Sequence, residues 1–295
     1  MKSLKQILKG AERGGVAVGH FNVAEFSMLK AIIGAASELC MPVIIGTSEG
    51  EAGFLGRKQA VALIKSFREE LKLPIFLNSD HTHNFEEVKK AVAAGYDAIL
   101  FDGGTLPLEE NIRQTKKVVQ YVKSKNKNIL VEGELGNIGS GSTIRKELPK
   151  GAAIKPEDLT KPADAVRFVK ATGVDMLAPA VGNIHGMFAH APEPALDIER
   201  IKEIKKAIRQ AQGKSVPLVL HGGSGNTDSD FLKAIDAGVS IIHISTELRA
   251  AWRKGLEAGL RARSEEIASY KIFPEAIEGV KKVVVRRLKL FNKLI

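Results

Sequence analysis

Residues 74–81 read PIFLNSDH, residues 175–185 read DMLAPAVGNIH, and residues 217–221 read PLVLH. Each stretch is a short apolar run that ends on a histidine, with turn-forming residues close behind. Runs of aliphatic and β-branched residues of this length are typical of strands buried in a parallel sheet. The three stretches therefore predict parallel strands that each carry a histidine at or just beyond the downstream end.

Strand-like and helix-like stretches alternate along the whole sequence. The predicted strands span residues 16–20, 43–47, 75–80, 98–102, 129–134, 175–181, 218–221 and 240–245. The predicted helices span residues 27–39, 58–71, 85–94, 108–123, 162–172, 198–211 and 229–237. This alternation predicts an α/β fold, a (β/α)8 TIM barrel that forms one domain over residues 1–295. The competing doubly wound sheet would carry a glycine fingerprint after its first strand, and the sequence has none there.

Both ends of the chain predict further helices. Leu4, Ile7, Leu8 and Ala11 recur at helical spacing, which predicts a short helix that closes the bottom of the barrel. Near the C-terminus a basic segment has an apolar stripe with the same spacing, and we expect this helical extension to pack on its own domain rather than on a membrane. The stripe consists of Val280, Val283, Val284, Leu288 and Phe291.

The composition limits the classes of protein. One cysteine, Cys40, excludes an internal disulfide and a zinc site built from several thiolates, and it favours a cytoplasmic location. Glu12 and the missing cleavage-site pattern argue against an export signal. No apolar run approaches the length of a membrane span. The net charge of +10 admits anionic partners, but an aromatic content of 5% leaves few side chains to stack on bases, so we expect no nucleic-acid partner.

The histidines at the strand ends predict a catalytic metal site. In a β/α barrel the downstream ends of all strands open on one face, so we expect His81, His185 and His221 to meet there. Three neutral imidazoles leave a zinc ion most of its positive charge and an open coordination position. A lone histidine is more often a core or capping residue, and we assign that role to His20 and His83.

Three carboxylates accompany these histidines. Asp80 could orient His81 or act as a general acid–base. Because adjacent side chains on an extended strand point to opposite sides, we expect Asp80 to act independently and to face the substrate. Glu132 and Glu134 share one side of their strand. Facing inward, they would order the histidines or offer the metal an alternative position; facing outward, they would be solvated.

Two small-residue stretches predict a phosphate site. HGGSG at residues 221–225 and HISTE at residues 243–247 follow the seventh and eighth strands, where barrels commonly bind phosphate. Small residues there expose backbone N–H groups at a helix start. Tight turns with helix caps would give the same pattern. The long irregular segment 136–159, which contains GNIGSGST, predicts a mobile lid over the active site.

Taken together, these motifs resemble the class II, metal-dependent fructose-bisphosphate aldolases, in the branch that includes the tagatose-bisphosphate aldolases. The resemblance covers almost the whole chain and rests on GHFNV, PVIIGTSEGE, SDH, LFDGG, VEGELG, TGVDMLAPAVGNIHG, PLVLHGGSG and ISTEL, in family order. It implies a zinc ion, or another divalent ion, bound by His81, His185 and His221. It also implies that Asp80 moves the proton of the substrate C4 hydroxyl group.

The same resemblance implies further site residues. Behind the metal ligands it places Asp102, Glu132 and Glu134. Asn22 and Ser48 would contact the substrate. The phosphate group would be bound by Gly136, Gly186, Gly222, Gly223, Ser224, Ser245 and Thr246.

The sequence departs from the family pattern in three respects. Many members carry a glutamate shortly after the ELG motif that moves the proton at the ketone-side carbon. Here Gly141 and Ser142 stand where acids are expected, which makes Glu147, the nearest carboxylate downstream, the replacement that we expect. His243 replaces an asparagine that usually contacts the triose phosphate, and His190 stands where a phosphate-binding lysine is common. A histidine can still donate a hydrogen bond in both places.

The resemblance implies a zinc-dependent aldolase that reversibly cleaves a ketose 1,6-bisphosphate, foremost fructose 1,6-bisphosphate, to dihydroxyacetone phosphate and glyceraldehyde 3-phosphate. It also implies a homo-oligomer, either a dimer or a tetramer. Two alternatives stay open: a metal-dependent barrel hydrolase and a catalytically silent protein that binds sugar phosphates. The sequence does not separate fructose from tagatose 1,6-bisphosphate, which differ only at C4.

Overall fold

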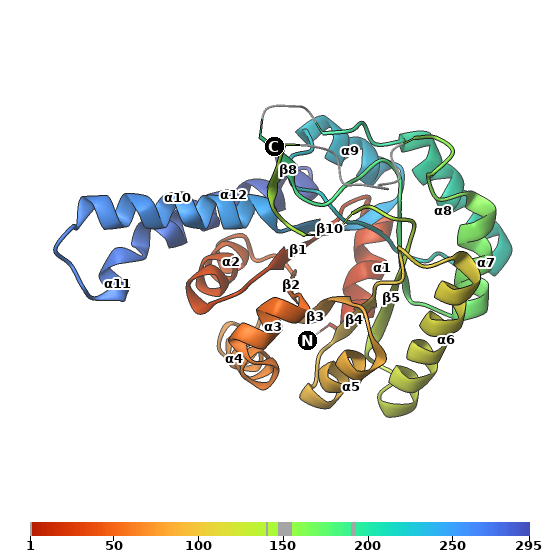
Figure 1. The fold of residues 1–295 in the computed structure, drawn as a ribbon, viewed down its shortest axis with the longest axis horizontal. Coiled ribbons are helices and arrows are strands. Elements are labelled where there is room, and N and C mark those ends of the chain that lie inside the picture. The colour runs from red at the N-terminus through yellow and green to blue at the C-terminus, as the bar shows by residue number, and fades with distance from the viewer. Residues whose placement is uncertain (1, 140, 147–154, 190–192) are drawn as a thin grey trace.

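The computed structural model describes residues 2–139, 141–146, 155–189 and 193–295. Its centre is a closed barrel of parallel strands in the spatial order β1-β2-β3-β4-β5-β7-β9-β10. These strands are β1 Val18–Asn22, β2 Val43–Thr47, β3 Ile75–Thr82, β4 Ala98–Phe101, β5 Leu130–Leu135, β7 Met176–Pro179, β9 Leu218–Leu220 and β10 Val239–Ile244. Helices surround the barrel (Figure 1), so the predicted (β/α)8 fold is confirmed.

Each surrounding helix turns one apolar side toward the strands. They are α2 Phe26–Leu39, α3 Glu49–Leu55, α4 Arg57–Leu71, α5 Phe85–Ala94, α6 Leu108–Lys125, α7 Pro162–Thr172, α8 Ile198–Gln212 and α9 Asp228–Asp236. In α8, for example, Ile201, Ile204 and Ile208 are fully buried, as their spacing requires. Gly95 and Gly173 end α5 and α7 with φ angles of 97° and 73°, a backbone conformation that favours glycine.

The first helix, α1 Leu4–Gly14, closes the bottom of the barrel. Its buried Leu4 and Leu8 belong to one apolar cluster with inward-facing strand residues such as Ile44 and Phe76. Burying each leucine contributes roughly 1.5–3 kcal/mol to stability. This packing confirms the closing helix that the sequence predicts.

The last three helices form an arm that extends away from the barrel (Figure 1). They are α10 Thr246–Ala262, α11 Ser269–Ile272 and α12 Pro274–Phe291. Helix α12 packs against α10 and α2, and it buries Val280, Val284, Leu288 and Phe291. The C-terminal stripe therefore packs on its own chain, as expected. Among the described residues, no helix is both long and apolar enough to cross a bilayer.

A small sheet outside the barrel was not predicted. Strand β6 Ile144–Arg145 pairs in parallel with β8 Met187–Phe188. Two-residue strands carry no periodic pattern, so the sequence shows only an irregular loop there. The pairing joins the chain that follows β5 to the chain that follows β7, and both segments leave the barrel at the downstream face.

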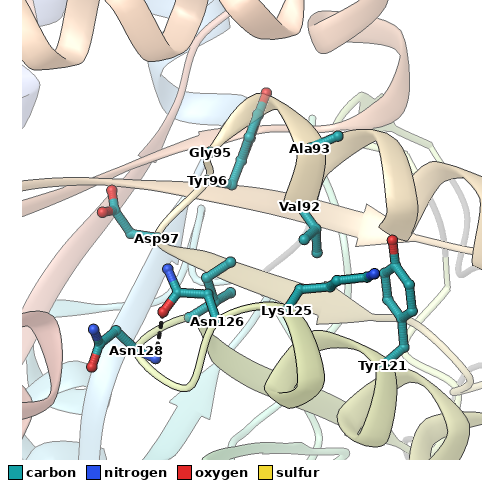
Figure 2. Close-up of a pocket in the computed structure, with 10 residues that line it drawn as sticks. Val92, Ala93, Gly95, Tyr96, Asp97, Tyr121, Lys125, Asn126 and Asn128 are labelled. Atoms are coloured by element: carbon teal, nitrogen blue, oxygen red, sulfur yellow. Dashed lines mark hydrogen bonds between the residues drawn. The ribbon is translucent and has the colours of Figure 1, made fainter.

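A pocket of about 530 Å³ opens on the bottom of the barrel, between the ends of α5 and α6 (Figure 2). Tyr96 and Asp97, just before β4, line one side, and Asn128, just before β5, lies on another. Barrel enzymes place their chemistry at the opposite, downstream ends of the strands. We therefore expect the catalytic residues at the downstream ends of the strands, on the opposite face of the barrel.

Candidate active site

The three strand-end histidines meet at the downstream face of the barrel. His81 lies near the end of β3, His221 follows β9 directly, and His185 lies in the segment after β7. The centroid of the His81 ring lies 4.5 Å from that of the His185 ring and 4.9 Å from that of the His221 ring. The centroids of His185 and His221 are 5.8 Å apart. Parallel strands thus bring together residues that are distant in the sequence.

A bulge in β3 aims two adjacent side chains at the same site. His81 has a φ angle of 47°, which is uncommon for a residue other than glycine. The register between β3 and β4 shifts between Ser79 and Thr82. Such a bulge re-aims side chains, and both Asp80 and His81 line one pocket. The expectation that these neighbours point apart is therefore wrong.

The donor atoms fit a divalent cation. Nε2 of His81 and Nδ1 of His221 are 3.2 Å apart, close to the roughly 3.4 Å between two nitrogen ligands of a tetrahedral zinc ion. Ligand atoms of His81, Glu134, His185 and His221 all lie within 4.8 Å of one another. Nε2 of His185 is buried and has no hydrogen-bond partner among the described residues. Nitrogen-rich sites of this kind suit zinc.

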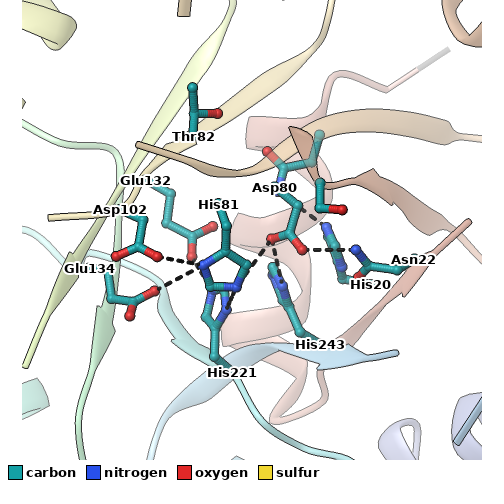
Figure 3. A network of polar contacts seen from close by, with 12 residues as sticks. His20, Asn22, Asp80, His81, Thr82, Asp102, Glu132, Glu134, His221 and His243 are labelled. Atoms are coloured by element: carbon teal, nitrogen blue, oxygen red, sulfur yellow. Dashed lines mark hydrogen bonds and ion pairs between the residues drawn. The ribbon is translucent and has the colours of Figure 1, made fainter. Parts of the chain in front are cut away.

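Two carboxylates fix the orientation of the imidazole rings (Figure 3). Oδ2 of Asp102 lies 2.8 Å from Nδ1 of His81, and Oε1 of Glu132 lies 2.7 Å from Nε2 of His221. Each carboxylate accepts a hydrogen bond from one ring nitrogen and so turns the other nitrogen toward the site. Glu134 places Oε2 3.6 Å from Nδ1 of His81. Both glutamates thus face inward, one of the two orientations that the sequence allowed.

The electrostatics favour positive charge at this point. Burial lowers the pKa of His81, but the carboxylates of Asp80, Asp102 and Glu134 outweigh it and raise the pKa to about 10. Burial and the charge on His81 hold the pKa of His185 well below its usual range. Burial and the neighbouring Asp102 raise the pKa of Glu134. The carboxylates therefore stabilise a cation here, whether a proton or a metal ion.

Asp80 is held as a carboxylate beside this cluster. Its Oδ2 accepts a hydrogen bond from Nδ2 of Asn22 at 2.9 Å, and Nδ1 of His243 lies 3.4 Å from its Oδ1. Burial raises the pKa of Asp80, but the charges and hydrogen bonds of His81, His243 and His20 outweigh this and hold the pKa well below its usual range. Asp80 is therefore ionised and able to accept a proton.

His20 is fully buried, as a core residue is, but it also lies against the site. Its ring stacks on that of His243, with centroids 3.5 Å apart, and its Nε2 lies 3.1 Å from Nδ2 of Asn78. Burial lowers the pKa of His20 to about 4. A Cβ on Gly46 would lie 2.1 Å from the His20 ring, so this ring position requires glycine in the neighbouring strand. His20 ends the predicted strand 16–20, but β1 begins and ends two residues later, so His20 lies in the middle of the strand.

The two predicted phosphate stretches lie together. Oγ of Ser224 accepts hydrogen bonds from the backbone N–H groups of Ser245 and Glu247, both at 3.3 Å. Gly222 has a φ angle of 59°, and a Cβ there would lie 2.1 Å from the carbonyl oxygen of Ile184. Only glycine fits this turn. These stretches and the histidines enclose a cavity of about 20 Å³, which is also lined by Asn22, Asp80, Ser142, Gly186, Gly223, His243 and Thr246.

Two expected substrate residues do not line this cavity. Gly136 is turned toward Ala180, since a Cβ on Gly136 would lie 2.6 Å from the Ala180 side chain. Ser48 is the N-terminal cap of α3 and accepts a hydrogen bond from the N–H of Glu51 at 3.4 Å. It reaches the site only indirectly, because Glu51 accepts a hydrogen bond from Nδ2 of Asn22 at 3.0 Å.

The segment over the site supplies contacts that the sequence does not reveal. The carbonyl oxygen of Ser142 accepts a hydrogen bond from Nη1 of Arg249 at 3.2 Å, and Nη2 of Arg249 pairs with Glu51 at 2.5 Å. Arg249 and Glu51 lie on helices rather than at strand ends; Glu51 ends the motif PVIIGTSEGE but was given no role, and Arg249 lies outside every motif. Glu147 and His190 lie outside the described residues.

The comparisons with known proteins agree with this site. The family model described as fructose-bisphosphate aldolase class-II matches residues 2–294. A relative from Bacillus subtilis (strain 168), named probable fructose-bisphosphate aldolase, is 33% identical over 98% of this chain and 97% of its own. The fructose-bisphosphate aldolase of Geobacillus stearothermophilus is 32% identical over 98% and 96%. The crystal structure of the YdjI aldolase from Escherichia coli K12 matches with a TM-score of 0.78 and 30% identity, covering 98% of this chain and 96% of that chain. The match spans nearly every residue, and the chain therefore belongs to the class II fructose-bisphosphate aldolase family.

Proposed function

We propose that this aldolase uses zinc to cleave fructose 1,6-bisphosphate reversibly into dihydroxyacetone phosphate and glyceraldehyde 3-phosphate. The observation that carries the metal assignment is the facing pair of ring nitrogens in His81 and His221, 3.2 Å apart, beside the unpartnered Nε2 of His185. A bound zinc ion would polarise the substrate ketone and so weaken the adjacent carbon–carbon bond. Because the chain belongs to an aldolase family, we favour the aldolase over the two alternatives, a hydrolase and a catalytically silent binder.

Asp80 moves the proton of the C4 hydroxyl group. In cleavage the hydroxyl proton passes to a carboxylate oxygen, the O–H electron pair forms the new carbonyl bond at C4, and the C3–C4 pair stays on C3. Oδ1 of Asp80 is buried and faces Nδ1 of His243 at 3.4 Å and Nε2 of His81 at 4.0 Å; it makes no short hydrogen bond among the described residues, and we assign it this role. Asn22 fixes the other oxygen, which orients the carboxylate. Condensation uses the same steps in reverse.

A phosphate group binds at the start of α10. Ser245 caps this helix without a side-chain hydrogen bond, and its buried Oγ lacks a partner among the described residues. The N-terminus of a helix attracts anions through its free N–H groups and its dipole. Gly222 and Thr246 lie beside it. The N–H of Gly223 already donates to the carbonyl oxygen of His243 at 3.2 Å. This glycine therefore lets the phosphate group approach the backbone closely but offers it no hydrogen-bond donor.

Substrate entry requires movement of the segment that carries Ser142. The cavity of about 20 Å³ is far smaller than the several hundred Å³ that a ligand of this size occupies. Ser142 lines the cavity and is held by Arg249. We assign the proton transfer at the ketone-side carbon to Glu147 in the same stretch of chain, and the second phosphate contact to His190.

A coupled cleavage assay tests the proposed reaction. The purified enzyme is assayed on fructose 1,6-bisphosphate and, in parallel, on tagatose 1,6-bisphosphate, before and after chelation and after addition of Zn²⁺ or Co²⁺. The proposal expects zinc-dependent formation of glyceraldehyde 3-phosphate with a higher kcat/KM for the fructose compound. A preference for the tagatose compound would overturn the substrate assignment alone.

We also propose that the enzyme works in the cytoplasm as a homo-oligomer, a dimer or a tetramer. Apolar side chains at the far end of the arm support self-association, since Leu260 is 48% exposed, Tyr270 76% and Ile267 96%. Exposed apolar groups that cluster in this way are typical of interaction surfaces. Light scattering of the wild type and of an Ile267→Asp/Tyr270→Ser variant tests this, and a monomeric wild type would contradict it.

A further inference from the structure

A second large cleft lies on the bottom of the barrel, opposite the active site. It has a volume of about 1260 Å³ and runs between α1, α8 and the loop from α8 to β9. Eight lysine and arginine side chains line it against two carboxylates. This excess of six positive charges is more than half of the net +10 of the entire chain. The charge of the protein is thus concentrated in one concave surface.

One wall of the cleft is a basic stripe on α1. Lys5, Lys9 and Arg13 are spaced four residues apart, so they lie on the same side of the helix. All three are exposed. Within the part of the chain that the structure describes, no carboxylate forms an ion pair with any of them. Like charges at this spacing repel and destabilise a helix, and a bound anion would relieve that repulsion.

The opposite wall is a basic stripe on α8 and the loop after it. Lys202, Lys206 and Arg209 follow helical spacing, and Lys214 lies two residues after the helix. Lys202 pairs with Glu199 at 2.7 Å. The other three have no ion-pair partner among the residues described. Two basic stripes therefore face one cleft, and all of their cations except Lys202 lack an ion-pair partner among the described residues.

The two carboxylates in the cleft are already neutralised. Glu12 pairs with Lys205 and accepts a hydrogen bond from Oγ of Ser215 at 2.6 Å. Lys205 also donates to the carbonyl oxygen of Val216 at 2.9 Å. The second carboxylate, Asp175, pairs with a lysine outside the cleft at 2.6 Å. These paired residues form a fixed polar surface in the cleft, and they leave the positive charge of the two basic stripes uncompensated.

We propose that this cleft binds a compact ligand that carries several phosphate groups. Cations on two facing walls suit a ligand whose charges point in more than one direction, and the volume accommodates several phosphates. Among the residues that the structure describes, no aromatic side chain lines the cleft, so they offer no platform for stacking the bases of a nucleic acid. The neighbouring pocket of Figure 2 has a single cation, Lys125, so excess charge is not general to the bottom of this barrel.

Binding here would join the closing helix to the body of the barrel. Helix α1 contacts the barrel interior through Leu4 and Leu8, while its basic side faces α8 across the cleft. A ligand that bridges α1 and α8 binds only the folded protein and therefore raises the melting temperature Tm. Because the attraction is electrostatic and exposed to solvent, added salt weakens it.

The test uses inorganic triphosphate as the probe and the full-length holoenzyme. Binding is followed by the rise in Tm and by hydrogen exchange of α1 and α8. The cleft variant is Lys9→Gln/Arg13→Gln/Lys206→Gln/Arg209→Gln, and a variant with only the two α8 substitutions guards against misfolding of α1. The matched control is Lys125→Gln/Lys127→Gln, which removes two cations from the same face of the barrel but outside the cleft.

The proposal expects the wild type and the control variant to gain the same Tm increase and protection in α1 and α8. The four-substitution variant should bind at least 10-fold more weakly, and the α8 variant should be intermediate. Equal binding by all four proteins would overturn the proposal. So would a fall in Tm on addition of triphosphate that is fully explained by removal of the metal. Tighter binding of a 20-nucleotide single strand than of triphosphate, with the same dependence on the cleft cations, would replace a compact ligand by nucleic acid.

Discussion

Nε2 of His81 and Nδ1 of His221 face each other at 3.2 Å, although the residues are 140 positions apart in the chain. A carboxylate lies behind each ring, Asp102 at the other nitrogen of His81 and Glu132 at that of His221. One nitrogen of each ring is thereby turned toward the same point. This is the arrangement that a shared metal ion requires.

Removal of either supporting carboxylate should weaken metal binding. We expect Asp102→Ala and Glu132→Ala to lower zinc affinity by about 10–100-fold, because the rings lose the hydrogen bonds that fix their tautomers. Competition with a chromophoric chelator measures the affinity. Excess zinc should restore much of the activity. Glu110→Gln, which removes a half-buried carboxylate on α6, is the control, and an equal loss of affinity in that variant would contradict the role assigned to Asp102 and Glu132.

Asp80→Ala should abolish most cleavage without removing the metal. The carboxylate acts on the substrate, so we expect kcat to fall by roughly 10²–10⁴-fold, the range for a general acid–base. Elemental analysis of the purified variant measures the zinc content. If the zinc disappears together with the side chain, Asp80 is part of the metal site and not an independent proton carrier.

His20 should make the protein less stable in mild acid. Its pKa is lowered to about 4 in the folded state, whereas an unfolded histidine titrates near 6.5. Between these values the unfolded chain binds a proton that folded His20 does not, so stability falls as the pH drops from 6.5 toward 4. The loss is about 3 kcal/mol, since one pKa unit corresponds to about 1.4 kcal/mol.

Urea unfolding of the wild type and of His20→Gln at pH 7 and pH 4 measures this effect. The free energy of unfolding of the wild type relative to the variant should decrease by about that amount between the two pH values. A pH-independent difference would show that His20 titrates normally in the folded protein.

Glu147 should control proton exchange at the ketone-side carbon. We expect Glu147→Gln to slow the incorporation of solvent deuterium into dihydroxyacetone phosphate at least 10-fold, as loss of a general base does. The affinity for dihydroxyacetone phosphate should stay nearly unchanged, because the phosphate site and the metal supply most of the binding free energy. Glu157→Gln, further along the chain, is the matched control. Exchange at the wild-type rate in Glu147→Gln would assign this proton to another group, such as His243.

The sequence predicts the features that follow from periodicity. Buried strands ending in histidine located His81 and His221, and the two-residue repeat of strands placed Glu132 and Glu134 on one side, where both contact the histidines. The bulge was not predictable, because the positive φ angle of His81 leaves no mark in residue type. As a result the common orientation of His81 and Asp80 emerges only in three dimensions.

Contacts between helices were equally hidden. Arg249 and Glu51 are 198 residues apart, and only the closed barrel brings α10 beside α3. The basic cleft has the same origin, since Lys9 and Arg209 lie 200 residues apart in the sequence. Each helix alone has an ordinary charged face, and the concentration of charge appears only where the two faces meet.

Removal of the metal tests the central claim most directly. One preparation is assayed for fructose 1,6-bisphosphate cleavage and for helical circular dichroism before chelation, after chelation and after addition of stoichiometric zinc. A catalytic ion held by residues on already formed strands predicts that cleavage falls to background, the helical signal persists, and zinc restores activity. Cleavage that survives removal of all metal, verified by elemental analysis, would contradict this account, and so would global unfolding on chelation.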